Sequence, residues 1–124
     1  MHIGLDIHGV IDSCPGFFSL LTHSMKSSGN TITILTGAQI KPKLIEELKS
    51  YNIVWDNLFS ISDYHIGIGT PMKFKDSDNP VIDDELWNRT KGEWCDENGV
   101  DIMIDDTERY KPFFKKCKFV YWKS

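Results

Sequence analysis

The chain alternates short apolar runs with stretches of helical periodicity, and this alternation limits its possible folds more than any other feature. The apolar runs cover residues 3–7, 31–36, 58–62 and 100–104, with a shorter run at 119–122. Several are apolar throughout, as is typical of strands buried on both faces of a parallel sheet. Strands that alternate with helices favour a parallel sheet covered on both sides. We therefore expect an α/β chain with a three-layer, Rossmann-like fold.

Helices are expected between these strands, where Pro or Asp opens a segment or Gly closes it. The predicted helices cover residues 15–28, 42–51, 84–98 and 108–116. Residues 64–80 are irregular and contain several Gly and Pro residues, which predicts a long loop with room for a small hairpin or a partial lid.

Polar residues stand where the apolar runs end. Asp6 lies near the end of the first run, Thr36 ends the second, and Asp105 and Asp106 follow the run at 100–104. In parallel α/β sheets, ligands bind outside the carboxyl ends of the strands, where the strand order reverses. Three distant parts of the chain are therefore expected to bring oxygen atoms to one edge of the sheet.

Carboxylates gathered at one edge repel one another unless a cation lies between them. Hard oxygen ligands of this kind suit Mg²⁺, which binds one or two carboxylates together with phosphate oxygens of a substrate. Lys91 lies in the middle of a predicted helix and can offset charge on a phosphoryl group. Thr36 offers a hydroxyl donor, and Gly37 leaves backbone N–H groups free beside it. Because a carboxylate such as Asp6 can also attack phosphorus, the set suits phosphoryl transfer from a monoester.

Four segments, in this order, resemble the motifs of the haloacid dehalogenase (HAD) superfamily. Asp6-Ile7-His8-Gly9-Val10 matches its Asp-x-Asp-x-(Thr/Val) motif, and Ile32–Thr36 matches its apolar strand ending in Ser or Thr. Lys91 is the best match for its lysine, and Ile102–Asp106 matches its strand ending in paired acids. The resemblance covers most of the chain. It implies a Mg²⁺-dependent phosphatase.

The resemblance also implies a role for each matched residue. Asp6 would be the nucleophile and a Mg²⁺ ligand, and the main-chain carbonyl of His8 would be a second ligand. Either Asp105 or Asp106 would be the acidic ligand, and the sequence leaves both open. Thr36 would hold a phosphoryl oxygen and would be the third catalytic residue beside Asp6 and His8.

Lys91 would neutralise the nucleophile and the transferred group. Lys73 and Lys75 are rivals for this role, although both fall in the predicted loop.

His8 departs from the family pattern, because the usual acid and base of the family's phosphatases is an aspartate at this position. Histidine exchanges a proton near neutral pH, so His8 is a candidate proton donor. The alternative is a catalytically impaired relative that binds a phosphorylated ligand or a protein partner. Asp12 is expected to be a turn or cap residue.

The segments between the motifs are short, so we expect no cap domain and an open site. An open site admits large substrates or relies on a partner or an oligomer to exclude water. The substrate class stays open among sugar phosphates, nucleotides, nucleic-acid ends and phosphoproteins. Lysines and aromatic residues crowd residues 110–123, which leaves nucleic-acid-end processing as a further alternative.

Length and composition set the remaining expectations. The 124 residues suit one domain covering residues 1–124, and the net charge of −4 argues against general affinity for nucleic acid. No apolar run approaches the roughly 20 residues that span a bilayer, and no signal peptide is evident. We therefore expect a cytoplasmic protein whose three cysteines are reduced thiols. The sequence does not indicate its oligomeric state.

Overall fold

A five-stranded parallel sheet organises the computed structural model, which describes residues 1–74 and 79–124. The strands are β1 (His2–Leu5), β2 (Thr31–Thr36), β3 (Asn57–Ser60), β6 (Ile102–Asp105) and β7 (Lys118–Tyr121). Their order across the sheet is β3-β2-β1-β6-β7, and every pair is parallel. The chain runs outward from β1 to β3 and then crosses back to β6, so the strand order reverses at β1.

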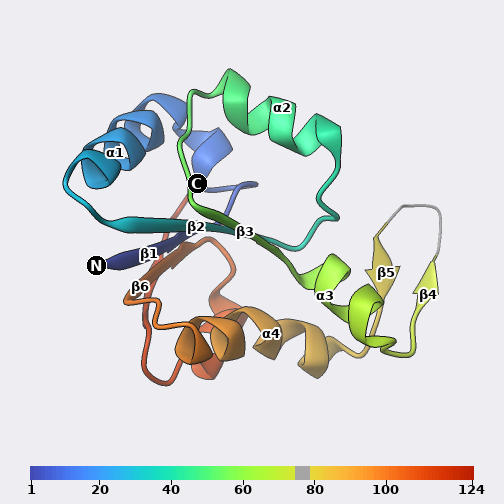
Figure 1. Cartoon of the computed structure of the whole chain (residues 1–124). Coiled ribbons are helices and arrows are strands. Elements are labelled where there is room, and N and C mark those ends of the chain that lie inside the picture. The colour runs from blue at the N-terminus through green and yellow to red at the C-terminus, as the bar shows by residue number, and fades with distance from the viewer. Residues whose placement is uncertain (75–78) are drawn as a thin grey trace.

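Helices cover both faces of the sheet. They are α1 (Pro15–Ser27), α2 (Pro42–Ser50), α3 (Ile61–Ile68) and α4 (Asp84–Glu97), with the short 3₁₀ helices η1 (Ile11–Ser13) and η2 (Glu108–Phe113). In Figure 1, α1 and α2 lie on one side of the sheet and α3 and α4 lie on the other. The predicted α/β, three-layer, Rossmann-like fold is confirmed, and no cap domain is present within residues 1–74 and 79–124.

Two apolar cores lie between these layers and hold them together. The core beneath α1 and α2 contains alternate residues of the central strands, including Ile3, Leu5, Ile32 and Ile34. The core on the opposite face contains Leu35, Phe59, Cys95, Met103 and Cys117. Successive side chains of a strand point to opposite faces, so β2 and β6 contribute to both cores. This explains why the strands are apolar throughout.

One predicted boundary is wrong. The strand expected at residues 58–62 ends at Ser60, and α3 begins with the next residue, so the predicted loop at 64–80 begins only after Ile68. The Ser60 hydroxyl accepts a hydrogen bond of 3.0 Å from the backbone N–H of Asp63 and caps the helix. Gly69 ends it with a φ of 75°. The cap therefore outweighed the apolar pattern across residues 60–62.

The remaining differences are smaller. A two-stranded hairpin, β4 (Lys73–Phe74) and β5 (Pro80–Val81), lies in the predicted loop, whose residues 75–78 fall outside the described residues. The helix expected at 108–116 is a 3₁₀ helix that ends at 113 and contains Pro112. All three cysteines are free thiols. Among the described residues, no helix has the length and apolar character needed to cross a membrane.

Candidate active site

Asp6 and Asp105 lie side by side at the carboxyl ends of β1 and β6. Leu5 pairs with Ile104, and the backbone N–H of Asp6 donates a hydrogen bond of 3.1 Å to the carbonyl of Ile104. Side-chain alternation places Asp6 on the same face as Gly4 and places Asp105 on the same face as Met103. That face is covered by α4, so both carboxylates point toward this helix.

Lys91 of α4 forms hydrogen bonds with the carboxylates of both Asp6 and Asp105. Its Nζ donates hydrogen bonds of 3.1 Å to Asp6 Oδ1 and 2.8 Å to Asp105 Oδ2. The second oxygen of Asp105 accepts a hydrogen bond of 3.0 Å from the backbone N–H of Thr107. The side chains of Lys91 and Asp105 are 3% and 0% exposed. Both oxygens of Asp105 are therefore engaged, and this residue anchors Lys91.

One buried ammonium cannot balance two buried carboxylates. Burial alone would lower the pKa of Lys91, but attraction to Asp6 and Asp105 outweighs it and raises that pKa above its usual value, which keeps the amine charged. Burial, repulsion from Asp105 and a side-chain hydrogen bond with Asp106 raise the pKa of Asp6 to about 7, despite the opposing attraction of Lys91. Lys91 therefore compensates the ionised form of Asp6 only in part.

Asp106 brings a third carboxylate to the same place. It follows β6 and lines the cleft, where its Oδ2 lies so close to Gly9 that a Cβ on this glycine would stand 2.0 Å from it. Gly9 has a φ of 87°, so both its backbone conformation and the lack of a side chain are needed here. The close approach of the loop after β1 to Asp106 therefore requires glycine.

The donor set of this corner suits a hard divalent cation. Asp6, Asp105 and Asp106 each offer an oxygen atom, and these atoms lie within 4.8 Å of one another. Three carboxylates against the single ammonium of Lys91 leave an excess of negative charge that a divalent cation would balance. Since Lys91 and Thr107 already bond the oxygens of Asp105, Asp6 and Asp106 are the better-placed ligands.

The end of β2 forms the neighbouring wall. Thr36 is buried, and its hydroxyl oxygen accepts a hydrogen bond of 3.2 Å from the backbone N–H of Ala38, so the hydroxyl hydrogen can be donated elsewhere. Gly37 packs beneath the ring of Trp87, and a Cβ would stand 2.8 Å from that ring. The predicted convergence of Asp6, Thr36 and the acid pair on one edge of the sheet is confirmed by the structure.

A cleft of about 780 Å³ opens above these residues. Its floor carries Asp6 and Lys91. Its other lining residues come from the loop after β1, the end of β2 and the loop that follows it, the segment around β5, α4, and the segment from the end of β6 into η2. Trp87 Nε1 donates a hydrogen bond of 2.9 Å to the Tyr110 hydroxyl, which fixes one wall. Among the rival lysines, Lys73 lies in β4 and does not line the cleft, and Lys75 lies outside the described residues.

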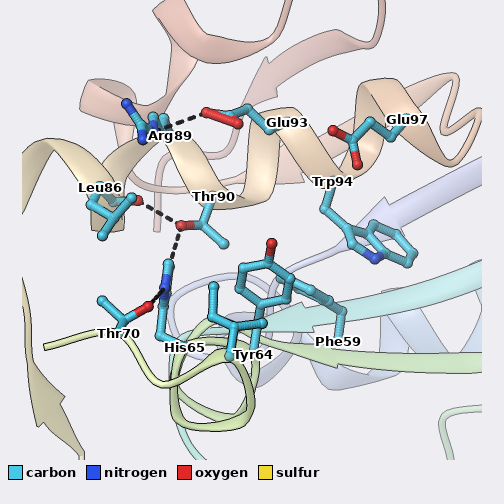
Figure 2. Close-up of a pocket in the computed structure, with 11 residues that line it drawn as sticks. Phe59, Tyr64, His65, Thr70, Leu86, Arg89, Thr90, Glu93, Trp94 and Glu97 are labelled. Carbon is cyan, nitrogen blue, oxygen red and sulfur yellow. Dashed lines mark hydrogen bonds and ion pairs between the residues drawn. The ribbon is translucent and has the colours of Figure 1, made fainter.

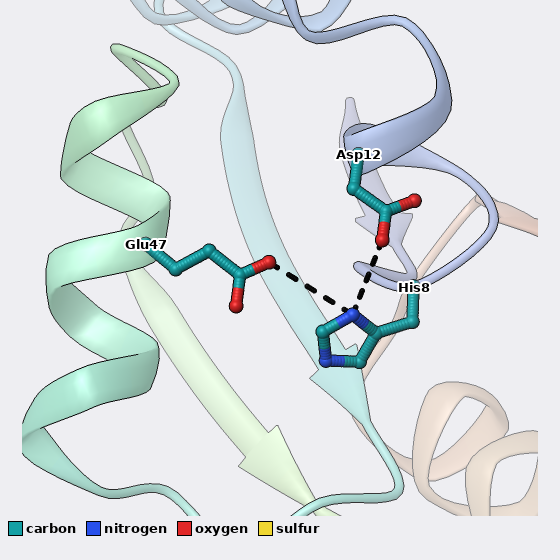
Figure 3. A group of neighbouring side chains, drawn as sticks. All are labelled: His8, Asp12 and Glu47. Atoms are coloured by element: carbon teal, nitrogen blue, oxygen red, sulfur yellow. Dashed lines mark hydrogen bonds and ion pairs between the residues drawn. The ribbon is translucent and has the colours of Figure 1, made fainter.

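His8 lines the edge of the cleft and contacts two carboxylates on the α2 side. Its Nδ1 lies 3.2 Å from Asp12 Oδ2 and 3.9 Å from Glu47 Oε2. Figure 3 shows the ring between Asp12 of η1 and Glu47 of α2. The His8 side chain is 54% exposed. A proton on Nδ1 bonded to Asp12 leaves Nε2 as the nitrogen that can exchange a proton with a ligand.

Asp12 has a larger role than the sequence indicated. Its Oδ1 accepts a hydrogen bond of 2.7 Å from the backbone N–H of Gly9, which is the predicted turn contact. Its Oδ2 meets His8, and only the short spacing between these two residues signalled this contact. Neither the approach of Glu47 to His8 nor the bond from Thr107 to Asp105 had a signal in the sequence, because both depend on how the elements pack.

Comparisons with protein-family models, with curated proteins and with solved structures found no match for this chain. Membership in the HAD superfamily therefore stays a prediction, which rests on the four matched segments.

Proposed function

We propose that this chain is a HAD-like, Mg²⁺-dependent phosphomonoester hydrolase that acts through an aspartyl-phosphate on Asp6. The observation that carries the proposal is a buried carboxylate at the floor of an open cleft, 3.1 Å from the Lys91 ammonium and beside a second accessible carboxylate, Asp106. A nucleophile, a charge clamp and acidic cation ligands thus share one corner.

Hydrolysis would proceed in two half-reactions. The Asp6 carboxylate attacks phosphorus, the new O–P bond forms as the ester P–O bond breaks, and the leaving oxygen accepts a proton. Water then attacks the phosphorus of the aspartyl-phosphate, loses a proton, and releases inorganic phosphate and the free carboxylate. The ionised form of Asp6 is required for the first step, and Lys91 favours that form.

The phosphoryl group would be held by Lys91, by the Thr36 hydroxyl and by backbone N–H groups next to Gly37. Asp6, Asp106 and the main-chain carbonyl of His8 would hold Mg²⁺. When bound, the ion would neutralise the carboxylates and polarise the phosphoryl oxygens.

His8 would carry the proton in both half-reactions. It gives a proton to the leaving oxygen and then receives one from the attacking water. Asp12 supports this role because its bond to Nδ1 fixes the tautomer with Nε2 available, and it stabilises the imidazolium that forms in the second step. Glu47, 3.9 Å from the same nitrogen, adds to that stabilisation.

The test is hydrolysis of para-nitrophenyl phosphate by the purified chain with and without Mg²⁺. Turnover should require Mg²⁺ and should be abolished by Asp6→Asn. Asp84→Asn is the matched control, since Asp84 lines the same cleft, whereas the ion pairs of Lys91 within the described residues are with Asp6 and Asp105. Turnover that survives Asp6→Asn would refute the mechanism.

The impaired alternative predicts a different outcome from the same assay. It predicts Mg²⁺ binding without turnover, and it predicts that His8→Asp creates activity. Fast turnover by the unmodified chain would exclude it. A panel of sugar phosphates, nucleotides and 3′- or 5′-phosphorylated oligonucleotides would then identify the substrate class.

A further inference from the structure

A second pocket, of about 240 Å³, lies between α3 and α4, and none of its lining residues lines the cleft. The two sites use different faces of α4. Leu86, Thr90, Trp94 and Glu97 recur at helical spacing and face the pocket, whereas Lys91 faces the cleft. The pocket is therefore a separate feature of the fold.

Its walls are aromatic and its floor is polar but satisfied. Phe59 packs against Trp94 with ring centroids 5.0 Å apart and lies 5.8 Å from the Tyr64 ring. On the floor, His65 Nδ1 lies 2.8 Å from the Thr70 hydroxyl and Nε2 lies 2.8 Å from the Thr90 hydroxyl. Figure 2 shows His65 between these two threonines. Both ring nitrogens of His65 have hydrogen-bond partners, so neither is left to bind an anion at the floor of the pocket.

The rim of the pocket is negative. Glu93 pairs with Arg89 at 3.0 Å, whereas Glu97 has no cationic partner among residues 1–74 and 79–124. Burial, with a smaller contribution from Arg89, lowers the pKa of His65 and favours its neutral form. One uncompensated carboxylate therefore stands above aromatic walls, a combination that attracts cations and repels anions.

From this charge and shape we propose that the pocket binds a small organic amine, an ammonium group carried on a short aromatic or apolar stem. The stem packs against Tyr64 and Trp94, and the ammonium group lies at the rim near Glu97. A cavity of about 240 Å³ holds one ring with a short chain and is too small for a nucleotide. This site does not depend on the proposed phosphatase activity.

Phenethylammonium is a suitable probe, with 2-phenylethanol as its uncharged counterpart and phenylacetate as its anionic one. Binding is measured by calorimetry or by amide chemical-shift changes. We expect saturable binding of the amine, binding at least about threefold weaker for the alcohol, and none for the acid. Equal binding of the amine and the alcohol, or no binding of the amine, would overturn the proposal.

Two substitutions locate the site, each with a matched control. Tyr64→Ala removes a wall, and Ile66→Ala removes a similarly exposed side chain of α3 that does not line the pocket. Glu97→Gln removes the rim charge, and Glu85→Gln removes an exposed charge of α4 elsewhere. Tyr64→Ala and Glu97→Gln should each weaken amine binding by about threefold or more, and the controls should not. Unchanged binding by both test variants would place the amine elsewhere and refute the assignment.

Discussion

Replacing Lys91 by methionine tests the buried charge cluster most directly. Methionine keeps the length of the side chain but removes the ammonium group that bonds Asp6 at 3.1 Å and Asp105 at 2.8 Å. Removing one partner of a buried ion pair typically costs about 3–5 kcal/mol, because the remaining charge loses its compensation. For a chain of 124 residues, each kcal/mol lowers the unfolding midpoint by about 4 °C. We therefore expect the midpoint to fall by roughly 12–20 °C.

The loss should depend on pH in a direction that the pKa of Asp6 fixes. Burial raises this pKa from 3.8 to about 7, so the folded chain binds the proton more tightly than the unfolded chain does. The stability contributed by this group is therefore present at low pH and is lost as pH rises through about 7. Without Lys91 the ionised form of Asp6 loses its neighbouring cation and becomes less favourable. Lys91→Met should therefore destabilise the folded chain more at pH 8 than at pH 5.

Thermal and urea unfolding of the metal-free protein at these two pH values measure both effects. Lys43→Met is the control, because Lys43 is an exposed lysine of α2, and it should change stability by less than about 0.5 kcal/mol. Adding Asp105→Asn to Lys91→Met should recover part of the loss. A loss of less than about 1 kcal/mol for Lys91→Met, with no dependence on pH, would refute the argument that Lys91 compensates buried carboxylates.

Three other predictions follow from single contacts. Mg²⁺ should increase the free energy of unfolding of the unmodified chain by about 2.7 kcal/mol at a hundredfold excess over its Kd, and so raise the unfolding midpoint. Asp106→Asn should remove most of this effect in the same thermal scan. Asp12→Asn should lower kcat by about tenfold without changing KM for a phosphate ester, because it disturbs the tautomer of His8. Gly92→Ala should destabilise the chain by about 1–3 kcal/mol in urea unfolding, since its Cβ would stand 2.4 Å from the backbone oxygen of Phe113.

The alternation of strands and helices was readable because it depends on local patterns. Apolar runs of strand length and the Pro or Gly residues that bound the helices are properties of adjacent residues, and they led to the correct fold class. The missed helix α3 shows the limit of this approach. Its first residues continue an apolar run, and the decisive signal was the single cap formed by Ser60 and Asp63.

The position of the candidate active site could also be predicted from the sequence. Residues that end parallel strands must reach one edge of the sheet, so Asp6, Thr36 and the acid pair could be placed together from the sequence. The sequence could not distinguish Asp105 from Asp106. The side-chain alternation of β6 relative to α4 decides that Asp105 is buried against Lys91 and that Asp106 lines the cleft.

The sequence by itself determined the layered fold and the edge on which the acids gather, because both follow from periodicity along the chain. Only the tertiary structure decided the orientation of the His8 ring toward Asp12 and Glu47, and only it produced the aromatic pocket between α3 and α4. The approach of Glu47 to His8 and the walls of the pocket join residues that are distant in sequence. Their side-chain directions are set by the packing of helices and strands against one another, and this packing cannot be inferred from local sequence patterns.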